Sequence, residues 1–453
     1  MKIRCKKSIN LIILALLIST FLSTNVFGST IKDGPQPPAT FSQSIVVMDE
    51  KTGQILYEKG GDILCMPAST TKVMTAILAI ENLDLDSMVT VGPKPPYAEG
   101  SSMGFKEGEI VMVRDLLYAL LLHSANDSAE ILAEAVSGTT EEFAKLMSQK
   151  AAELGATNTT FVNPSGLTGE ENNLTTAKDL AMITAAAARI PELLEISQTL
   201  SYKLPFTNLV TDTNRWATNK NSLMIKSSEY YYEPIILGKT GWTPAAGYAF
   251  TTVGEKDGQR IVISILKSVN QGTYWKETKE LMEWAFNNFT VYKLYEKDQN
   301  LKKVIAKNGD KIDLIADSDF YYTGVKNLST QSPHLEFNES LAITGNYKAG
   351  EVIDKAKVIL DGEDLGTINL VAKTDITIES EDQVPVNEPL SPDSNTTPVK
   401  KAASYAIGIF LLFTLIILSV RLINRSRQRK LRRRTMSAKR LEYYKNRDNL
   451  SAK

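Results

Sequence analysis

Residues 67–80, P-A-S-T-T-K-V-M-T-A-I-L-A-I, contain the pattern that decides the fold. From Ser69 onward, apolar residues recur at helical spacing, so we expect a helix with one buried face. Residues three apart share a helix face, which places the Lys72 amine beside the Ser69 hydroxyl. A hydroxyl becomes a nucleophile when a neighbouring base takes its proton, and a lysine of lowered pKa can be that base. An S-x-x-K sequence on its own is also common on solvated helices.

A second hydroxyl follows the apolar run Leu116–Leu122, in the motif Ser124-Ala125-Asn126. The Ser124 hydroxyl could relay a proton to a leaving amine, and the Asn126 amide could bind a substrate peptide group. A structural role is the alternative, because both side chains are good helix N-caps. His123 precedes Ser124, but consecutive side chains diverge on a helix, which disfavours a Ser-His pair.

The third motif is Lys239-Thr240-Gly241, at the end of a predicted strand over 236–241. A lysine and a threonine that face a cleft can bind a carboxylate, and a glycine lets a substrate backbone approach closely. An ordinary edge strand with an exposed lysine could have the same three residues. The order and spacing of the motifs are more specific, since S-x-N follows S-x-x-K by 55 residues and K-T-G follows after another 115. That set resembles the signature of penicillin-binding proteins and serine β-lactamases.

The periodicity around these motifs predicts an α+β domain with one antiparallel sheet and a helical subdomain, because strands from both ends flank a helical middle. Thr140 is expected to cap the helix 141–154 and Gly155 to stop it. The expected strands are 44–47, 54–57, 236–240, 248–253 and 261–266, and the expected helices begin at Ser69 and cover 114–136, 141–154 and 275–289.

The stretch 291–373 has a different pattern. Its short β-rich pieces are separated by turn dipeptides such as Asn308-Gly309 and Asp361-Gly362, which predicts a small all-β domain. It contains no reactive cluster, and His334 is expected at the surface. The β-rich pieces are 304–306, 311–315, 352–358 and 367–371.

Four segments narrow the resemblance to one branch of the penicillin-binding proteins. They are A-S-T-T-K-V-M-T at Ala68–Thr75, L-H-S-A-N-D-S at Leu122–Ser128, N-P-S-G-L at Asn163–Leu167 and G-K-T-G-W-T-P-A-A-G-Y at Gly238–Tyr248. Together they resemble the low-molecular-mass penicillin-binding proteins, the serine D-alanyl-D-alanine carboxypeptidases of peptidase family S11, whose fold is β-lactamase/transpeptidase-like. The resemblance covers 36–373, because that family's small C-terminal β domain also fits 291–373.

The resemblance implies an acyl-enzyme reaction on peptidoglycan stem peptides that end in D-Ala–D-Ala. Ser69 would be the nucleophile, Lys72 would accept its proton, and Ser124 with Lys72 would pass the proton to the departing D-alanine. The backbone N–H groups of Ser69 and Trp242 would hold the oxyanion. The implied substrate ligands are Asn126, Lys239, Thr240, Gly241 and Lys220. Neither a cofactor nor a metal is implied, and β-lactam antibiotics would be covalent inhibitors.

Two residues depart from the family pattern. Lys220 stands where relatives often carry Arg, and a lysine cannot give a carboxylate the two-pronged contact of a guanidinium. Trp242 stands where some relatives have His, which keeps the backbone N–H but removes an imidazole. Two other functions stay open. A class A β-lactamase carries S-D-N and a deacylating Glu, which Glu170-Glu171-Asn172-Asn173 could mimic, although we interpret that segment as a surface turn. A non-catalytic penicillin sensor or wall-binding protein could use the same fold.

The charges of the chain are segregated, although its 453 residues carry 51 Lys+Arg and 52 Asp+Glu. Residues 1–28 contain four basic side chains and no acidic ones, and residues 421–453 contain 13 basic and two acidic ones. This leaves 34 basic and 50 acidic side chains between them, so an acidic body lies between two basic ends. Only two His and two Cys are present, which excludes multi-histidine zinc sites and a disulfide framework.

Two hydrophobic segments predict export and membrane attachment. Residues 1–28 combine a basic start, an apolar run and small residues before Ser29, as in a cleavable signal peptide; an uncleaved anchor is the alternative. An uncharged run of 19 residues, 402–420, predicts a transmembrane helix over 402–423. Its basic tail, 424–453, would remain cytoplasmic, with the catalytic domain on the other side of the cell membrane. Nucleic-acid binding by the tail is the disfavoured alternative. The other predicted parts are a catalytic domain 29–290, a β domain 291–373 and an acidic, proline-rich linker 374–401.

Overall fold

The computed structural model describes residues 34–377, apart from 212–213, 307–308, 328–331, 339–340, 342 and 344. At its centre is a five-stranded antiparallel sheet with the strand order β2-β1-β9-β8-β7. Segments from both ends of the catalytic domain meet in this sheet, as the sequence predicted, and β7 lies at its edge. The strands are β1 Ser44–Asp49, β2 Ile55–Lys59, β7 Ile235–Thr243, β8 Gly247–Lys256 and β9 Gln259–Ser268.

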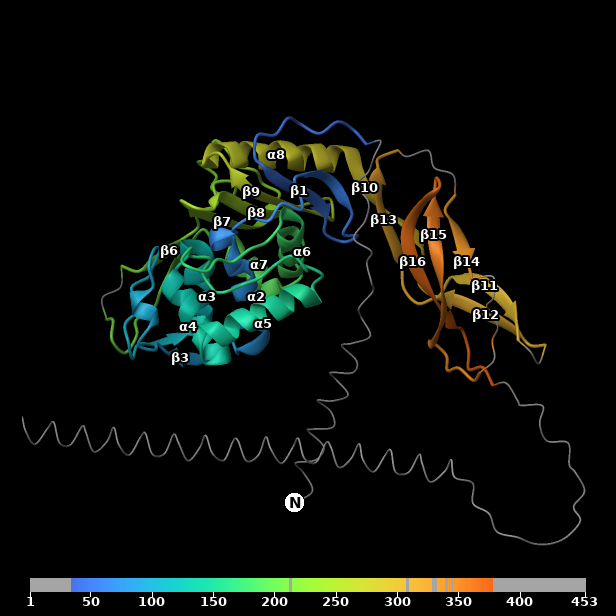
Figure 1. The fold of residues 1–453 in the computed structure, drawn as a ribbon, viewed down its shortest axis with the longest axis horizontal. Helices are drawn as coiled ribbons and strands as arrows, with labels where there is room; N and C mark the ends of the chain where they lie inside the picture. The colour runs from blue at the N-terminus through green and yellow to red at the C-terminus, as the bar shows by residue number, and fades with distance from the viewer. Residues whose placement is uncertain are drawn as a thin grey trace, which may run out of the picture. The chain divides into compact units, whose positions relative to one another are not determined.

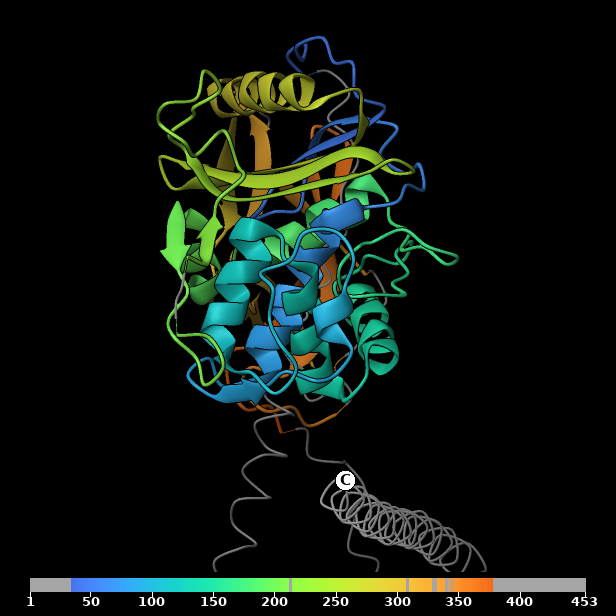
Figure 2. The same ribbon diagram turned by 90° about the vertical axis from the view of Figure 1, so that its left-hand side faces the viewer.

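The strands of the sheet carry buried apolar side chains on both faces, so the sheet lies between two apolar layers. On β1, Ile45 and Val47 pack in the core that includes α8, Gln271–Asn288. Val46 and Met48 alternate with them and pack in the core of the helical subdomain. Figures 1 and 2 show α8 along one face of the sheet and the other helices across the opposite face.

The helical subdomain is built around α2, whose first eight residues, from Lys72 onward, are all buried. Two short hairpins belong to the same region. The helices are α2 Lys72–Asn82, α3 Val113–Tyr118, α4 Asn126–Ser137, α5 Thr140–Glu153, α6 Ala177–Ala187 and α7 Pro191–Gln198, and the hairpin strands are β3 Met88–Thr90 with β4 Ile110–Met112 and β5 Ser201–Lys203 with β6 Trp216–Thr218.

The single helix predicted over 114–136 is wrong, because the chain breaks at Ser124. After α3, a π-helical turn covers Ala119–His123, and Ser124 then has a φ of 67° in the left-handed region. In a continuous helix the Asn126 N–H would donate to a carbonyl of the preceding turn. Here it donates to the Ser101 carbonyl at 2.6 Å. A left-handed conformation costs an L-residue free energy, and such residues gather at functional sites.

The ends of two other elements also differ from the sequence predictions. Thr139, and not Thr140, caps α5, since its hydroxyl accepts the Glu142 N–H at 3.1 Å. Gly155 follows the helix with a φ of 84°, as expected for a residue that stops it. The helix predicted over 275–289 begins four residues earlier, at Gln271, because Asn270 accepts the Thr273 N–H and caps it.

The C-terminal part of the described chain is all β. A five-stranded sheet has the order β11-β12-β16-β15-β14, and β10 pairs with β13. The prediction of a small all-β domain is therefore confirmed, although three of its strands, β10, β13 and β14, were not predicted. His334 is exposed, as expected, on β14. The strands are β10 Phe289–Tyr295, β11 Asn300–Ile305, β12 Lys311–Ala316, β13 Phe320–Val325, β14 His334–Phe337, β15 Val352–Leu360 and β16 Glu363–Ala372.

Within the part of the chain that the structure describes, no helix has the length and apolar character needed to cross a membrane. The predicted signal peptide 1–28, the transmembrane helix 402–423 and the basic tail 424–453 all lie outside the described residues, as does the linker 374–401 beyond residue 377.

Candidate active site

Ser69 lies in a 3-10 turn, Ala68–Thr71, that leads directly into α2. Its side chain is partly exposed, so solvent and ligands can reach the hydroxyl. The backbone before it is constrained: Ala68 has a φ of 48°, and a Cβ on Gly166 would lie 1.8 Å from the Ala68 carbonyl oxygen. An unfavourable backbone conformation persists where surrounding contacts hold it in place. The close packing of Gly166 against Ala68 is such a contact.

Lys72 is completely buried beside Ser69, and three atoms surround its amine. Its Nζ lies 2.9 Å from Ser69 Oγ, 2.7 Å from Asn126 Oδ1 and 2.7 Å from the Ser165 carbonyl oxygen. The amide and carbonyl oxygens can only accept, so each takes one N–H of the amine. In a neutral lysine, the remaining direction toward Ser69 holds the lone pair. The predicted proximity of Ser69 and Lys72 is thus present, in a geometry suited to proton transfer.

The electrostatics of this pocket favour the neutral amine. Burial lowers the pKa of Lys72 well below its usual value, and the positive charges of Lys239 and Lys220 lower it further. The carboxylate of Asp127 opposes this effect as the smallest cause. A lysine with a lowered pKa is more often neutral than an ordinary lysine at the same pH, and only the neutral amine can act as a base.

Two asparagines hold the Ser165 carbonyl in place, a role that the sequence alone did not predict. Asn163 Oδ1 accepts the N–H groups of Ser165 and Gly166 at 3.2 and 2.7 Å. Asn173 Nδ2 donates to the Asn163 carbonyl and to Thr71 Oγ1, both at 3.0 Å. The segment N-P-S-G-L is therefore fastened to the turn that carries Ser69.

The segment 170–173, which the sequence predicted to be a surface turn, has exposed carboxylates and one buried asparagine. Glu170 and Glu171 are exposed, as expected of a surface turn, whereas Asn173 is buried. The carboxylates of this segment therefore face solvent, and the neighbouring asparagine has the structural role. In the sequence, Asn173 is distinguished only by its position ten residues after Asn163, and that spacing does not indicate a hydrogen bond unless the fold is known.

Ser124 forms a second serine–lysine pair with Lys239 of β7. Lys239 Nζ lies 2.9 Å from Ser124 Oγ and 2.9 Å from the Thr240 carbonyl oxygen. Both side chains are buried. Burial, followed by the charge of Lys220, lowers the pKa of Lys239 to about 7. The left-handed turn at Ser124 thus brings its hydroxyl to the edge strand, and among the described residues no hydrogen bond joins it to Lys72.

Asn126 connects the Lys72 pocket to the loop before it. Its Oδ1 accepts from Lys72, its Nδ2 donates to the Glu99 carbonyl, and its backbone N–H donates to Ser101. A Cβ on Gly100 would lie 2.9 Å from Asn126 Nδ2, so the loop packs closely against the amide. Both ends of the Asn126 amide are therefore occupied by the protein itself in this structure.

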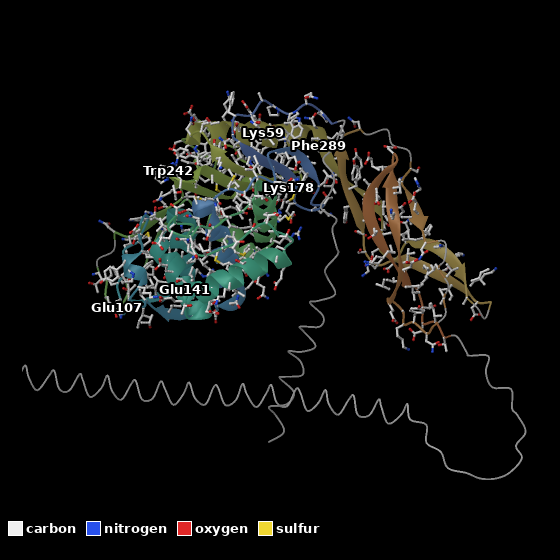
Figure 3. The ribbon with its side chains drawn as sticks, in the orientation of Figure 1. Lys59, Glu107, Glu141, Lys178, Trp242 and Phe289 are labelled. Carbon is white, nitrogen blue, oxygen red and sulfur yellow. The ribbon has the colours of Figure 1, made fainter. Side chains whose placement is uncertain are left out.

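Gly241 lets the strand β7 pass directly beside the nucleophile. A Cβ at this position would lie 2.9 Å from the Ser69 nitrogen and 3.0 Å from the Pro67 carbonyl oxygen. The glycine thus makes room for the backbone of Ser69, in addition to the substrate approach that the sequence predicted. Trp242 follows it, with its side chain 52% exposed at the surface (Figure 3). The centre of its ring lies 6.0 Å from that of Tyr248, the residue opposite it on β8.

Lys220 lies at the mouth of the site and not inside it. Its side chain is exposed, and its Nζ is 3.5 Å from Ser101 Oγ. Burial of part of the side chain lowers its pKa. His123 is half-buried, and within the described chain it has no hydrogen bond to Ser124, in keeping with the argument against a Ser-His pair. The structure thus groups Ser69, Lys72, Ser124, Asn126, Lys239, Thr240 and Gly241 around one place, with Lys220 and Trp242 at its rim.

Such an arrangement, a partly exposed hydroxyl beside a buried lysine of lowered pKa, can carry out acyl transfer. Residues 31–270, more than half of the chain, match the family model described as D-alanyl-D-alanine carboxypeptidase. The chain belongs to this family. Residues 289–377 of the carboxypeptidase match the C-terminal domain of penicillin-binding protein 5, which agrees with the all-β domain described above.

Named relatives support the same assignment for both domains. The carboxypeptidase DacF of Bacillus subtilis is 26% identical over 378 residues, covering 82% of this chain and 95% of that protein. DacB2 of Mycobacterium tuberculosis is 36% identical over 260 residues, covering 56% and 84%. The crystal structure of penicillin binding protein 5 from Haemophilus influenzae matches with a TM-score of 0.66 at 26% identity, over 76% of this chain and 100% of that one. The serine D-alanyl-D-alanine carboxypeptidase resemblance is confirmed.

Proposed function

We propose that this carboxypeptidase removes the terminal D-alanine of peptidoglycan stem peptides through an acyl-enzyme on Ser69. The observation that carries the proposal is the Lys72 amine, 2.9 Å from Ser69 Oγ, with two of its hydrogens held by atoms that can only accept. A base fixed in this way is ready to take the serine proton.

In acylation, Ser69 Oγ attacks the carbonyl carbon of the D-Ala–D-Ala bond and its proton passes to Lys72 Nζ. The negative charge that develops on the carbonyl oxygen is held by the N–H groups of Ser69 and Trp242. The close approach of β7 at Gly241 supports this role, because it brings the two N–H groups to the same place. Loss of one such donor typically lowers the rate by about 10²–10³-fold.

The leaving D-alanine needs a proton on its nitrogen and a partner for its carboxylate. Ser124 Oγ supplies the route for the proton from Lys72, while Lys239 and Thr240 bind the carboxylate, with Lys220 nearby. The hydrogen bond between Lys239 and Ser124 supports these two roles. Through it, binding of the carboxylate by Lys239 can orient the Ser124 hydroxyl that transfers the proton. Water then attacks the acyl-enzyme, Lys72 again accepts the proton, and the shortened peptide leaves. Penicillins acylate Ser69 by the same first step.

We further propose that the enzyme is exported by residues 1–28 and held in the cell membrane by residues 402–423, with its catalytic domain outside. The acidic character of the body and the basic tail after residue 421 support this orientation. Protease treatment of intact cells should remove the catalytic domain and leave a membrane-bound fragment with the tail. A catalytic domain that resists protease until the cells are lysed would contradict the orientation.

D-alanine release from a pentapeptide that ends in D-Ala–D-Ala tests the proposed reaction, with Ser69→Ala as the matched variant. Wild type should release D-alanine and become labelled by penicillin, and the variant should do neither. Penicillin labelling without D-alanine release would favour a sensor. Rapid turnover of the penicillin would favour a β-lactamase.

A further inference from the structure

β7 is an edge strand, and a substrate could pair with the outer edge of its backbone beside Ser69. At Gly238, four residues before Trp242, another side chain already occupies this edge. The Gly238 N–H donates to Ser197 Oγ, at the end of α7, at 3.3 Å. In a regular antiparallel strand, alternate residues direct their N–H groups to the same side. Gly238, Thr240 and Trp242 therefore share the outer edge, and Ser197 occupies it at the first of these positions.

A second contact ties the segment 219–221 to this closure. Asn219 Nδ2 donates to the carbonyls of Ser197 and Thr199 at 2.8 and 3.1 Å. Ser197 is 3% and Asn219 6% exposed, so neither side chain is available to a ligand. The chain that leads to Lys220 is thus anchored on the residue that closes the edge.

Asn221 packs directly on the backbone of β7. A Cβ on Gly238 would lie 2.3 Å from Asn221 Nδ2, so only a glycine permits this contact. The Asn221 N–H donates to Asn219 Oδ1 at 2.9 Å, and its own Oδ1 accepts the Leu223 N–H at 3.1 Å. Lys220 is held between two buried asparagines and is directed across the opening toward Ser101.

We propose that Ser197, Asn219 and Asn221, here called the leaving-side bracket, restrict the enzyme to leaving groups of a single residue with a free carboxylate. The inference rests on the proposed function, because it needs the reacting carbonyl at the Trp242 N–H and the carboxylate near Lys239. A substrate in this position runs antiparallel to β7. Each residue spans about 3.3 Å, so the leaving residue lies opposite 239–241. A further residue would lie opposite Gly238, where the bracket stands.

Within the described chain, no hydrogen bond joins the bracket to Ser69, so we treat its three members as positioning residues. They exclude longer leaving groups by occupying the edge and by holding the Lys220 ammonium where a C-terminal carboxylate ends. The specificity for the end of a peptide therefore comes from a structural element outside the three motifs.

The test compares three acylated peptides that differ only at the C-terminus: D-Ala–D-Ala, D-Ala–D-Ala-amide and D-Ala–D-Ala–Gly. The amide removes the charge, and the glycine moves it by one residue. For wild type we expect kcat/KM to be about 10²-fold or more higher for the free acid than for the glycine peptide. In Asn221→Ala the ratio should fall about tenfold through better cleavage of the glycine peptide, while the preference for acid over amide is retained.

Two variants and one control make the result decisive. Ser197→Ala should move the ratio in the same direction as Asn221→Ala, and Ser148→Ala, which removes a partly buried hydroxyl on α5, should leave it unchanged. The rate of Ser69 acylation by penicillin reports an intact nucleophile in each variant. Equal cleavage of the acid and glycine peptides by wild type would overturn the inference and leave the proposed function standing. Equal losses on both peptides in the bracket variants would also overturn it. Failure of wild type to release any D-alanine would instead overturn the proposed function and this inference with it.

Discussion

The helical subdomain and the edge strand each present a buried lysine to a serine at 2.9 Å, yet the two pockets differ. Lys72 is surrounded by fixed acceptors from α4 and from the loop 163–167, so its hydrogens are already assigned. Lys239 has one further contact, to the carbonyl of its own neighbour Thr240. A lysine whose hydrogens are all directed at the protein is suited to be a base. A lysine with a donor to spare is suited to bind a carboxylate.

The largest expected effect comes from removing the first pair. Ser69→Ala and Lys72→Met should each lower D-alanine release by about 10⁴-fold or more, because nucleophile and base act as one unit. The double variant should be little worse than either single one. Additive losses, measured by kcat for wild type and the three variants, would show that the two residues act independently.

Removal of Lys239, the lysine of the second pair, should affect substrate binding more than the chemical step. Lys239→Ala should lower kcat/KM by roughly 10²-fold, mainly through KM, since a buried charge that meets the substrate carboxylate is lost. The pH dependence provides a separate test. Lys239 binds a carboxylate when protonated, so affinity should fall as pH rises through about 7. In Lys239→Arg this decline should disappear, because a guanidinium stays charged. A decline that persists in that variant would assign it to another group.

A smaller effect is expected from the asparagine that fastens the Ser165 carbonyl. Asn173→Ala removes donors to Thr71 and to the Asn163 carbonyl, and should destabilise the fold by about 1–3 kcal/mol. Displacement of the carbonyl beside Lys72 should also reduce kcat by roughly tenfold. Chemical denaturation and steady-state kinetics report the two effects. Unchanged kcat in a destabilised variant would limit the asparagine to folding.

The smallest effect is expected at the exposed carboxylates of 170–171. Glu170→Gln should change the rate of penicilloyl-enzyme hydrolysis by less than about twofold, as surface substitutions usually do little. Mass spectrometry of the covalent adduct over time measures that rate. A marked stabilisation of the adduct in this variant would support the β-lactamase alternative.

The motifs allowed the lysine pockets to be predicted in part. The spacing of Ser69 and Lys72 is local, so helix geometry was enough to place them together. The pairing of Ser124 with Lys239 depends on the left-handed conformation of Ser124, which follows an apolar run that favours a continuous helix, and tertiary contacts decide that conformation. Asn173 and the leaving-side bracket could not be predicted either, because their hydrogen bonds join segments that only the fold brings together. In the β domain, β10 was missed because it follows α8 without an intervening turn, and β14 because it is only four residues long.

The pH dependence of Ser69 acylation by penicillin tests the central claim most directly, because the step requires neutral Lys72. The neutral fraction rises with pH through the pKa of Lys72, which burial and two neighbouring lysines hold well below the ordinary 10.5. The acylation rate constant should therefore stop rising with pH well below pH 10.5. A rate constant that continues to rise until the pH approaches 10.5, the value of an ordinary lysine, would contradict the account.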